Sequence, residues 1–242
     1  MKLKYIISFT TLFLILSLTN MSYAQNEEDT QKIVDTLKDM KSIVVVKYAP
    51  DNSTYCSATM ITPNVGITAK HCVGNDKKEG YVGAVYPGQS GIRTPFGYMN
   101  ITSYIPDIAE DIAIIKGNEE DKSSDYKHYI KNFEATISPL TKEEAKSLEG
   151  KRVYSYGYPS NYVGSPLVRV EGAIKKYNIV NRTFDTTMPV SQGQSGAGVF
   201  LVDNERFVGV LNSGYKDINT NKDWARVSVL DQRLVNWFKA NK

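Results

Sequence analysis

The sequence predicts an all-β fold with a helix at its C-terminus. Apolar and polar residues alternate along a series of short segments, which is the pattern of half-buried strands. Gly, Asn or Pro residues stand between many of these segments and mark turns. Near the C-terminus the spacing changes, because Leu234, Trp237 and Phe238 form a single apolar stripe, and this spacing indicates a helix that packs on a core.

The predicted strands form two groups. The first group begins with residues 43–48 and continues to about residue 115, and a charged connection follows. The second group has predicted strands at residues 152–156, 167–174, 182–187, 198–202 and 207–211. Asp231 is placed to cap the final helix, since aspartate accepts hydrogen bonds from a first helical turn. We therefore expect a first β unit over residues 42–120, a crossover over residues 121–150, a second β unit over residues 151–229 and a helix over residues 230–242.

The N-terminus has the features of a secretory signal peptide. Lys2 and Lys4 precede an apolar run from residue 5 to about residue 18, and Ser22-Tyr23-Ala24 suits cleavage after Ala24. A membrane anchor is the alternative, but the run is short for a spanning helix. We expect residues 1–24 to be removed and the mature protein to be extracellular, with no membrane association.

Residues 25–41 form a separate polar segment. Ile33, Leu37 and Met40 lie at helical spacing, which predicts an amphipathic helix over residues 27–40. Either a pro-segment that is removed on activation or an N-terminal helix that is retained fits this pattern.

The charge of the chain excludes one class of partner. Lysine and arginine number 29 against 26 acidic residues, and loss of the two signal-peptide lysines leaves 27 against 26. Such a balance argues against a nucleic-acid-binding surface. We expect a monomer that needs no cofactor and no metal ion.

Two segments carry residues for acyl transfer. Ser195 lies within Gly-Gln-Ser-Gly-Ala-Gly at residues 193–198, and His71 follows an apolar, β-branched stretch. A serine hydroxyl becomes a good nucleophile only when a nearby imidazole takes its proton. The second histidine, His128, lies in a polar run typical of a solvated loop, so His71 is the better candidate base.

A serine and a histidine that act together in acyl transfer form a catalytic triad with a carboxylate that orients the imidazole. Two similar segments offer such a carboxylate. Asp107 and Asp111 each precede Ile-Ala. Asp111 leads directly into an apolar run that suits a buried strand, whereas Asp107 follows Pro106 and is separated from that strand. Asp111 is the preferred third member.

The order His71, Asp111, Ser195 resembles that of the chymotrypsin-like serine peptidases, in particular the bacterial glutamyl endopeptidases and exfoliative toxins. Two further segments support this resemblance, Cys-Ser-Ala-Thr-Met-Ile-Thr-Pro at residues 56–63 and Tyr-Gly-Tyr-Pro at residues 156–159. It extends from about residue 42 to the C-terminus. It implies two six-stranded antiparallel β-barrels with a C-terminal α-helix, and a serine endopeptidase that hydrolyses proteins or peptides through an acyl-enzyme.

The resemblance also implies roles for other residues. The N–H groups of Gly193 and Ser195 would form the oxyanion hole. Cys56 and Cys72, the only cysteines, would form a disulfide beside the catalytic histidine, which suits an oxidising compartment. A zinc site or a free thiol is the alternative, but a zinc ion would need more ligands than Cys56, His71 and Cys72 supply.

The chain departs from its relatives in the specificity pocket. Val190 and Leu211 stand where glutamyl endopeptidases carry a hydroxyl residue and a histidine, and Pro189 stands where trypsin-like members carry an aspartate. We therefore expect a neutral pocket for an uncharged, apolar residue before the cleaved bond, since a buried carboxylate without a donor is costly. The segment Asn212, Ser213 and Gly214 would line one wall and run beside the substrate.

Gln194 is a further departure, because pancreatic relatives carry an aspartate before the nucleophile that pairs with a new N-terminus. That charge is absent here. The fold that this resemblance implies also serves secreted binding proteins with lost or suppressed activity, so the alternative is a catalytically latent, toxin-like or binding protein on the same fold.

Overall fold

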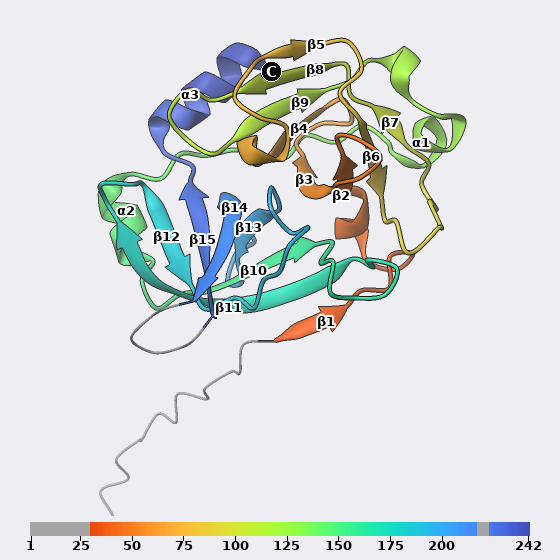
Figure 1. Ribbon diagram of the computed structural model, residues 1–242. Helices are drawn as coiled ribbons and strands as arrows, with labels where there is room; N and C mark the ends of the chain where they lie inside the picture. The colour runs from red at the N-terminus through yellow and green to blue at the C-terminus, as the bar shows by residue number, and fades with distance from the viewer. Residues whose placement is uncertain (1–29, 217–222) are drawn as a thin grey trace, which may run out of the picture.

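The computed structural model describes residues 30–216 and 223–242, so the predicted signal peptide over residues 1–24 lies outside the described residues. Two β units lie side by side, and helix α3 at the C-terminus packs against the first of them (Figure 1). None of the helices in the described part is long and apolar enough to cross a membrane.

The second β unit is a closed barrel of six antiparallel strands. Its strand order is β11-β10-β13-β14-β15-β12, and β12 pairs with β11 to close it. The strands are β10 (Arg152–Gly157), β11 (Val168–Asn178), β12 (Thr183–Thr186), β13 (Gly198–Leu201), β14 (Phe207–Lys216) and β15 (Asp223–Val229). Inward side chains such as Val170, Phe184 and Val227 are fully buried and form its core.

The first β unit is a curled antiparallel sheet of eight strands in the order β5-β8-β9-β4-β3-β2-β6-β7. The strands are β2 (Val45–Ala49), β3 (Cys56–Met60), β4 (Val65–Thr68), β5 (Lys78–Glu79), β6 (Ala84–Pro87), β7 (Met99–Asn100), β8 (Ser103–Pro106) and β9 (Ala113–Lys116). The two-residue strands β5 and β7 lie at its edges and do not pair with each other within the described part of the chain. The predicted all-β fold class is confirmed, with this sheet of eight strands where six had been predicted.

Three buried tyrosines hold the core of the first unit. The hydroxyls of Tyr48, Tyr104 and Tyr126 donate to backbone carbonyls at 2.7–2.9 Å, so none of these polar atoms is left unpaired in the apolar interior. Burial raises the pKa of all three hydroxyls.

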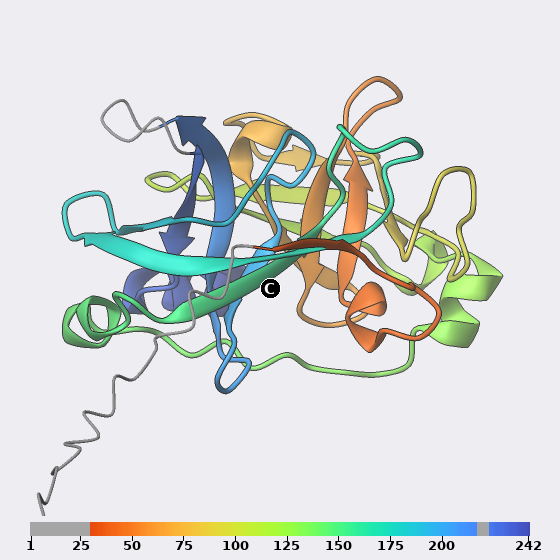
Figure 2. The same ribbon diagram turned by 90° about the horizontal axis from the view of Figure 1, so that it is seen from below.

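The segment before the first unit differs from its prediction. In place of the helix expected over residues 27–40, the described part forms strand β1 (Gln31–Ile33), a turn and a 3-10 helix, η1 (Met40–Ile43). Strand β1 pairs with β11, whose edge would otherwise expose unpaired backbone groups (Figure 2). The predicted apolar stripe points largely to solvent, with exposed fractions of 53%, 72% and 71% for Ile33, Leu37 and Met40.

The crossover carries two short helices, α1 (Ser124–Tyr129) and α2 (Lys142–Ser147), and the chain ends in α3 (Gln232–Asn241). The predicted cap is present, because the Asp231 side chain accepts from the Leu234 N–H at 2.8 Å. Leu234 and Phe238 of α3 join an apolar cluster with side chains of both β units, including Ile114 of β9 and Val210 of β14. This shared cluster fixes the two units relative to each other.

Candidate active site

His71 and Asp111 are brought together by the pairing of β4 with β9. His71 lies in a short 3-10 helix, η2 (Lys70–Cys72), just beyond β4, and Asp111 lies two residues before β9. Thr68 of β4 pairs with Ala113 of β9, so both residues lie at the same end of this antiparallel pair. The side chain of His71 is therefore placed beside that of Asp111.

Asp111 holds His71 at two points. Its Oδ2 lies 2.7 Å from the ring Nδ1, and its Oδ1 accepts from the backbone N–H of His71 at 2.8 Å. An ionised carboxylate only accepts hydrogen bonds, so Nδ1 carries the proton and Nε2 of the neutral ring is left free to accept another. This is the tautomer that a general base requires.

The electrostatics of the pair agree with this role. The hydrogen bond to Asp111 raises the pKa of His71 above its usual value, although partial burial opposes the shift. Burial tends to raise the pKa of Asp111, but the hydrogen bonds from the His71 ring and backbone outweigh it and lower that pKa. Asp111 is therefore ionised at neutral pH and stabilises the protonated imidazole.

Asp107 has a different environment. It is buried, and its carboxylate accepts two bonds from Arg233 of α3 at 2.8 and 2.9 Å as well as the N–H groups of Ala109 and Glu110. Its backbone carbonyl accepts from Lys70 Nζ at 2.9 Å. These bonds anchor the loop that leads to Asp111.

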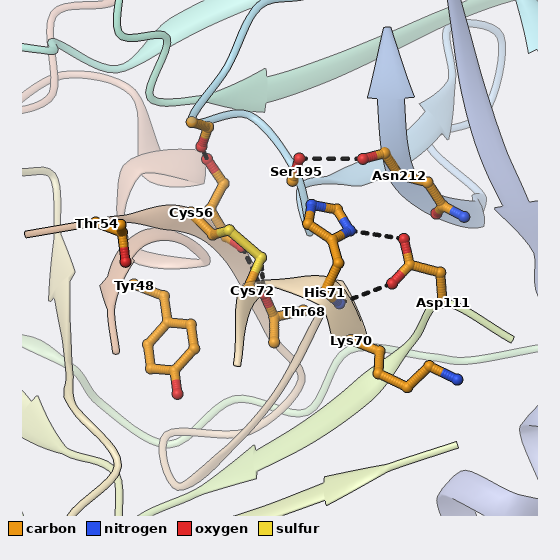
Figure 3. The surroundings of a disulfide bond; sticks show 12 residues. Tyr48, Thr54, Cys56, Thr68, Lys70, His71, Cys72, Asp111, Ser195 and Asn212 are labelled. Carbon is orange, nitrogen blue, oxygen red and sulfur yellow. Dashed lines mark hydrogen bonds and ion pairs between the residues drawn. A yellow bond between two sulfur atoms is a disulfide. The ribbon is translucent and has the colours of Figure 1, made fainter. Parts of the chain in front are cut away.

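Ser195 lies in the loop between β12 and β13, across from His71. In Figure 3 the imidazole lies between Ser195 and Asp111. The hydroxyl of Ser195 donates to the carbonyl of Asn212 at 3.0 Å, and the interactions of the described residues include no bond from it to His71. His128, the other histidine, is exposed on α1 and contacts Tyr129.

The loop before Ser195 has a backbone that suits glycine. Gly193 has a φ of +94°, and a Cβ there would lie 2.3 Å from the Tyr158 carbonyl oxygen. The carbonyl of Gln192 accepts from the N–H of Ser160 at 2.8 Å. Because the peptide bond is trans, the N–H of Gly193 points away from Ser160. Within the described part of the chain, neither this N–H nor that of Ser195 donates to another group.

Gln194 turns into the protein. Its side chain is fully buried, and its Oε1 accepts from the N–H of Ser191 at 2.8 Å. Gln194 thereby closes the loop on itself with a neutral hydrogen bond.

A disulfide joins Cys56 of β3 to Cys72, next to His71 (Figure 3). The Cys56, His71 and Cys72 ligand atoms lie within 4.8 Å of one another, as in a metal site. The two sulfur atoms are bonded to each other, so they are not thiolate ligands.

A pocket of about 540 Å³ opens beside Ser195. Its lining residues are His71, Val190, Ser191, Gln192, Ser195, Asn212, Ser213, Gly214, Tyr215, Lys216 and Trp224. Of the predicted pocket residues, Val190, Asn212, Ser213 and Gly214 belong to this lining. Pro189 does not, and Leu211 is only 1% exposed in the core of the second barrel.

Sequence reasoning missed the far wall of this pocket. Strand β14 was predicted to end at residue 211, but it continues to Lys216, and Tyr215 pairs there with Trp224 of β15. Residues 224–229 read Trp-Ala-Arg-Val-Ser-Val, in which apolar residues alternate with Arg226 and Ser228. This alternation is the signal that could have indicated β15 and the extension of its partner β14.

The chain also resembles known proteins. Residues 56–210 match the trypsin-like peptidase domain. A solved structure of Glu endopeptidase in complex with MPD is similar at 20% identity and a TM-score of 0.68, over 88% of this chain and 97% of that one.

Two further solved structures, each 15% identical to this chain, share the fold. Thermostable serine protease AL20 from an extremophilic microorganism has a TM-score of 0.61, over 84% of this chain and 99% of its own. Protease Anisep from Arthrobacter nicotinovorans has a TM-score of 0.64, over 87% and 98%. No curated protein sequence matches the chain.

Proposed function

Because the chain belongs to the trypsin-like peptidase family, we propose that it is a secreted serine endopeptidase with Ser195, His71 and Asp111 as its triad. The observation that carries this proposal is the two-point bond between Asp111 and His71, beside a serine on a glycine-rich loop. The bond fixes both the position and the tautomer of the imidazole, which a general base needs.

The reaction follows from these groups. The Ser195 hydroxyl turns from the Asn212 carbonyl to Nε2 of His71, which takes its proton as Oγ attacks the substrate carbonyl. The tetrahedral intermediate collapses to an acyl-enzyme, and His71 gives the proton to the departing amine. A water molecule then attacks the ester, with His71 again as base, and this step releases the acid and restores Ser195.

The oxyanion hole would consist of the N–H groups of Gly193 and Ser195. The trans peptide after Gln192 and the Ser160 bond to its carbonyl support the first of these donors, since they turn the Gly193 N–H away from Ser160. Two donors aimed at a developing oxyanion stabilise the transition state more than the ground state.

We propose a neutral primary specificity pocket. Val190 packs against Gly214, where an added Cβ would lie 3.1 Å from Val190 Cγ2, so an aliphatic group narrows the space. Lys216 is the charged residue among the lining residues apart from His71, and it is exposed to solvent. The described residues of this lining include no buried counter-charge for an acidic or basic substrate side chain, so an uncharged residue before the cleaved bond fits best.

Export is part of the proposal. The signal-like residues 1–24 support it, and so does the Cys56–Cys72 disulfide, because such bonds persist in oxidising compartments.

Cleavage profiling of a random peptide library tests the proposal, with the mature protein beside Ser195→Ala. Cleavage after uncharged residues, lost in Ser195→Ala, is the expected result. Cleavage mainly after glutamate would leave the triad standing and refute the neutral pocket. Equal cleavage by both proteins would refute the triad.

A second candidate function rests on the Ser195–Asn212 bond. A hydroxyl held on a carbonyl at 3.0 Å is turned from its base, as it would be in a latent toxin-like or binding protein. Labelling with a fluorophosphonate separates the two functions, because only a competent site reacts. Absence of labelling in the mature protein favours the latent protein, and labelling that Ser195→Ala abolishes favours the peptidase.

A further inference from the structure

Ser57 of β3 is bonded through all of its polar groups at the boundary between the two β units. It is fully buried. Its N–H donates to the Ser195 carbonyl at 2.8 Å, and its hydroxyl donates to the Gly193 carbonyl at 2.9 Å. The hydroxyl also accepts from the Tyr158 N–H at 3.0 Å, and the Ser57 carbonyl accepts from Thr68 Oγ1 at 2.9 Å.

We propose that the Ser57 hydroxyl is the positioning group of the oxyanion hole, an inference that rests on the proposed peptidase function. It would act through the backbone of residues 193–195 and would not touch the substrate. The test therefore has to separate an effect on transition-state binding from an effect on folding.

The need for such a group comes from Gly193. A glycine at a φ of +94° has few restraints of its own, so the direction of its N–H depends on the two peptide groups that flank it. The Ser160 N–H holds the carbonyl before Gly193, and the Ser57 hydroxyl holds the carbonyl after it. Together these two bonds fix the two peptide planes that meet at the Gly193 Cα, and the first of these planes contains the donor N–H.

Ser57 also connects the two restraints. Tyr158, which donates to the Ser57 hydroxyl, lies two residues before Ser160, which holds the Gln192 carbonyl. One buried hydroxyl thus joins the loop of the nucleophile to the segment that supports it. The neutral side chain of Gln194 forms no ion pair that could do this instead, and its Oε1 bonds within its own loop.

The same strand offers a matched control. Thr59 is also buried in β3, and its hydroxyl also crosses to the second unit, where it accepts from the Gly198 N–H at 2.7 Å. That bond holds β13 beyond the nucleophile and does not reach the peptide groups around Gly193. Thr59→Ala therefore loses a buried bond of the same kind without loosening the oxyanion loop.

The experiment compares wild type, Ser57→Ala and Thr59→Ala with the best peptide found by library profiling and with the trifluoromethyl ketone of the same peptide. For Ser57→Ala we expect kcat to fall by about tenfold or more and KM to change by less than about twofold, because an oxyanion donor acts mainly on the transition state. Affinity for the ketone, which forms a tetrahedral adduct, should fall by a similar factor. Ser57→Thr keeps the hydroxyl and should restore most of kcat.

Urea unfolding of each variant supplies the folding control. We expect Thr59→Ala to lose stability and keep kcat within about twofold of wild type. Equal losses of kcat in Ser57→Ala and Thr59→Ala, or a wild-type kcat in Ser57→Ala, would overturn the inference while leaving the peptidase function intact. If neither Ser57→Ala nor Ser57→Gly folds while Thr59→Ala does, Ser57 serves the fold and the inference is wrong. Absence of Ser195-dependent cleavage in wild type would instead remove the proposed function itself.

Discussion

Removal of the Cys56–Cys72 disulfide gives the sharpest test of what stabilises the first β unit. The bond joins residues 16 positions apart, β3 on one side and the 3-10 helix of His71 on the other. We consider the double substitution Cys56→Ala/Cys72→Ala, because a single substitution would leave a reactive thiol.

The expected loss follows from the size of the closed loop. For a separation of 16 residues, the chain-entropy relation gives about 10 cal/mol/K, or about 3 kcal/mol at 25 °C. In a domain of this size each kcal/mol shifts Tm by about 2–4 °C, so Tm should fall by about 6–12 °C. Well below that Tm, the two hydrogen bonds that Asp111 accepts from His71 still hold the histidine in place, and we expect kcat to stay within about threefold of wild type.

Urea unfolding of the oxidised wild type and the double variant, each followed by fluorescence, measures the difference. Wild type in a reductant is the matched control and should unfold with the variant. A difference below about 1 kcal/mol with an unchanged m value would refute the loop-entropy reasoning. A collapse of kcat in a variant that is still folded would show that the disulfide, and not Asp111, positions His71.

Three further substitutions test the site and its supports. Asp111→Asn should lower kcat by roughly 10⁴-fold. It should also move the acidic limb of the kcat/KM profile to lower pH, because the carboxylate that raises the pKa of His71 is lost. In wild type that limb should lie above about pH 6.5, and a pH-rate profile checks both expectations. Gly196→Ala should cost roughly 2–4 kcal/mol in urea unfolding, since φ is +88° and the new Cβ would lie 2.2 Å from a backbone oxygen. Arg233→Ala should cost about 2 kcal/mol at pH 7, less than a fully buried pair, because two N–H groups still bond Asp107. Burial tends to raise the pKa of Asp107, but its bonds from Arg233 and these N–H groups outweigh burial and lower that pKa. The stability that the Arg233–Asp107 pair contributes is therefore present above about pH 4 and is lost as the pH falls through the folded pKa of Asp107. Unfolding at pH 7 and pH 3 should show that the stability difference between wild type and Arg233→Ala narrows at the lower pH.

Strands β12 and β13 are buried at every position, but other parts of the second barrel could be predicted from sequence because inward and outward residues alternate. Strand β11 shows this along most of its length, where buried and less buried residues alternate. The choice between Asp107 and Asp111 is a similar case. Its basis was the position of each residue relative to an apolar strand, and the structure places Asp111 beside His71 and Asp107 beside Arg233.

The segment before Ile43 could not be predicted in this way. Its described part contains a strand of three residues, which is too short for an alternation to be recognised. That strand exists because the edge of β11 offers backbone partners, a fact of the tertiary structure that local sequence does not contain. Helical spacing of Ile33, Leu37 and Met40 was therefore misleading, since these side chains have no common surface to cover.

One wall of the pocket beside Ser195 contains an irregularity that the periodicity of the sequence does not reveal. The register between β14 and β15 shifts between Leu211 and Ser213, and a shift of this kind disrupts the ladder locally and bends the strand. Leu211, before the shift, is buried in the barrel core, although the resemblance to glutamyl endopeptidases had placed it in the pocket. Asn212, at the shift itself, has no ladder partner, so its carbonyl is available to the Ser195 hydroxyl. The extra residue in the strand thus leaves the Asn212 carbonyl without a ladder partner, at the position where it accepts the bond from the Ser195 hydroxyl.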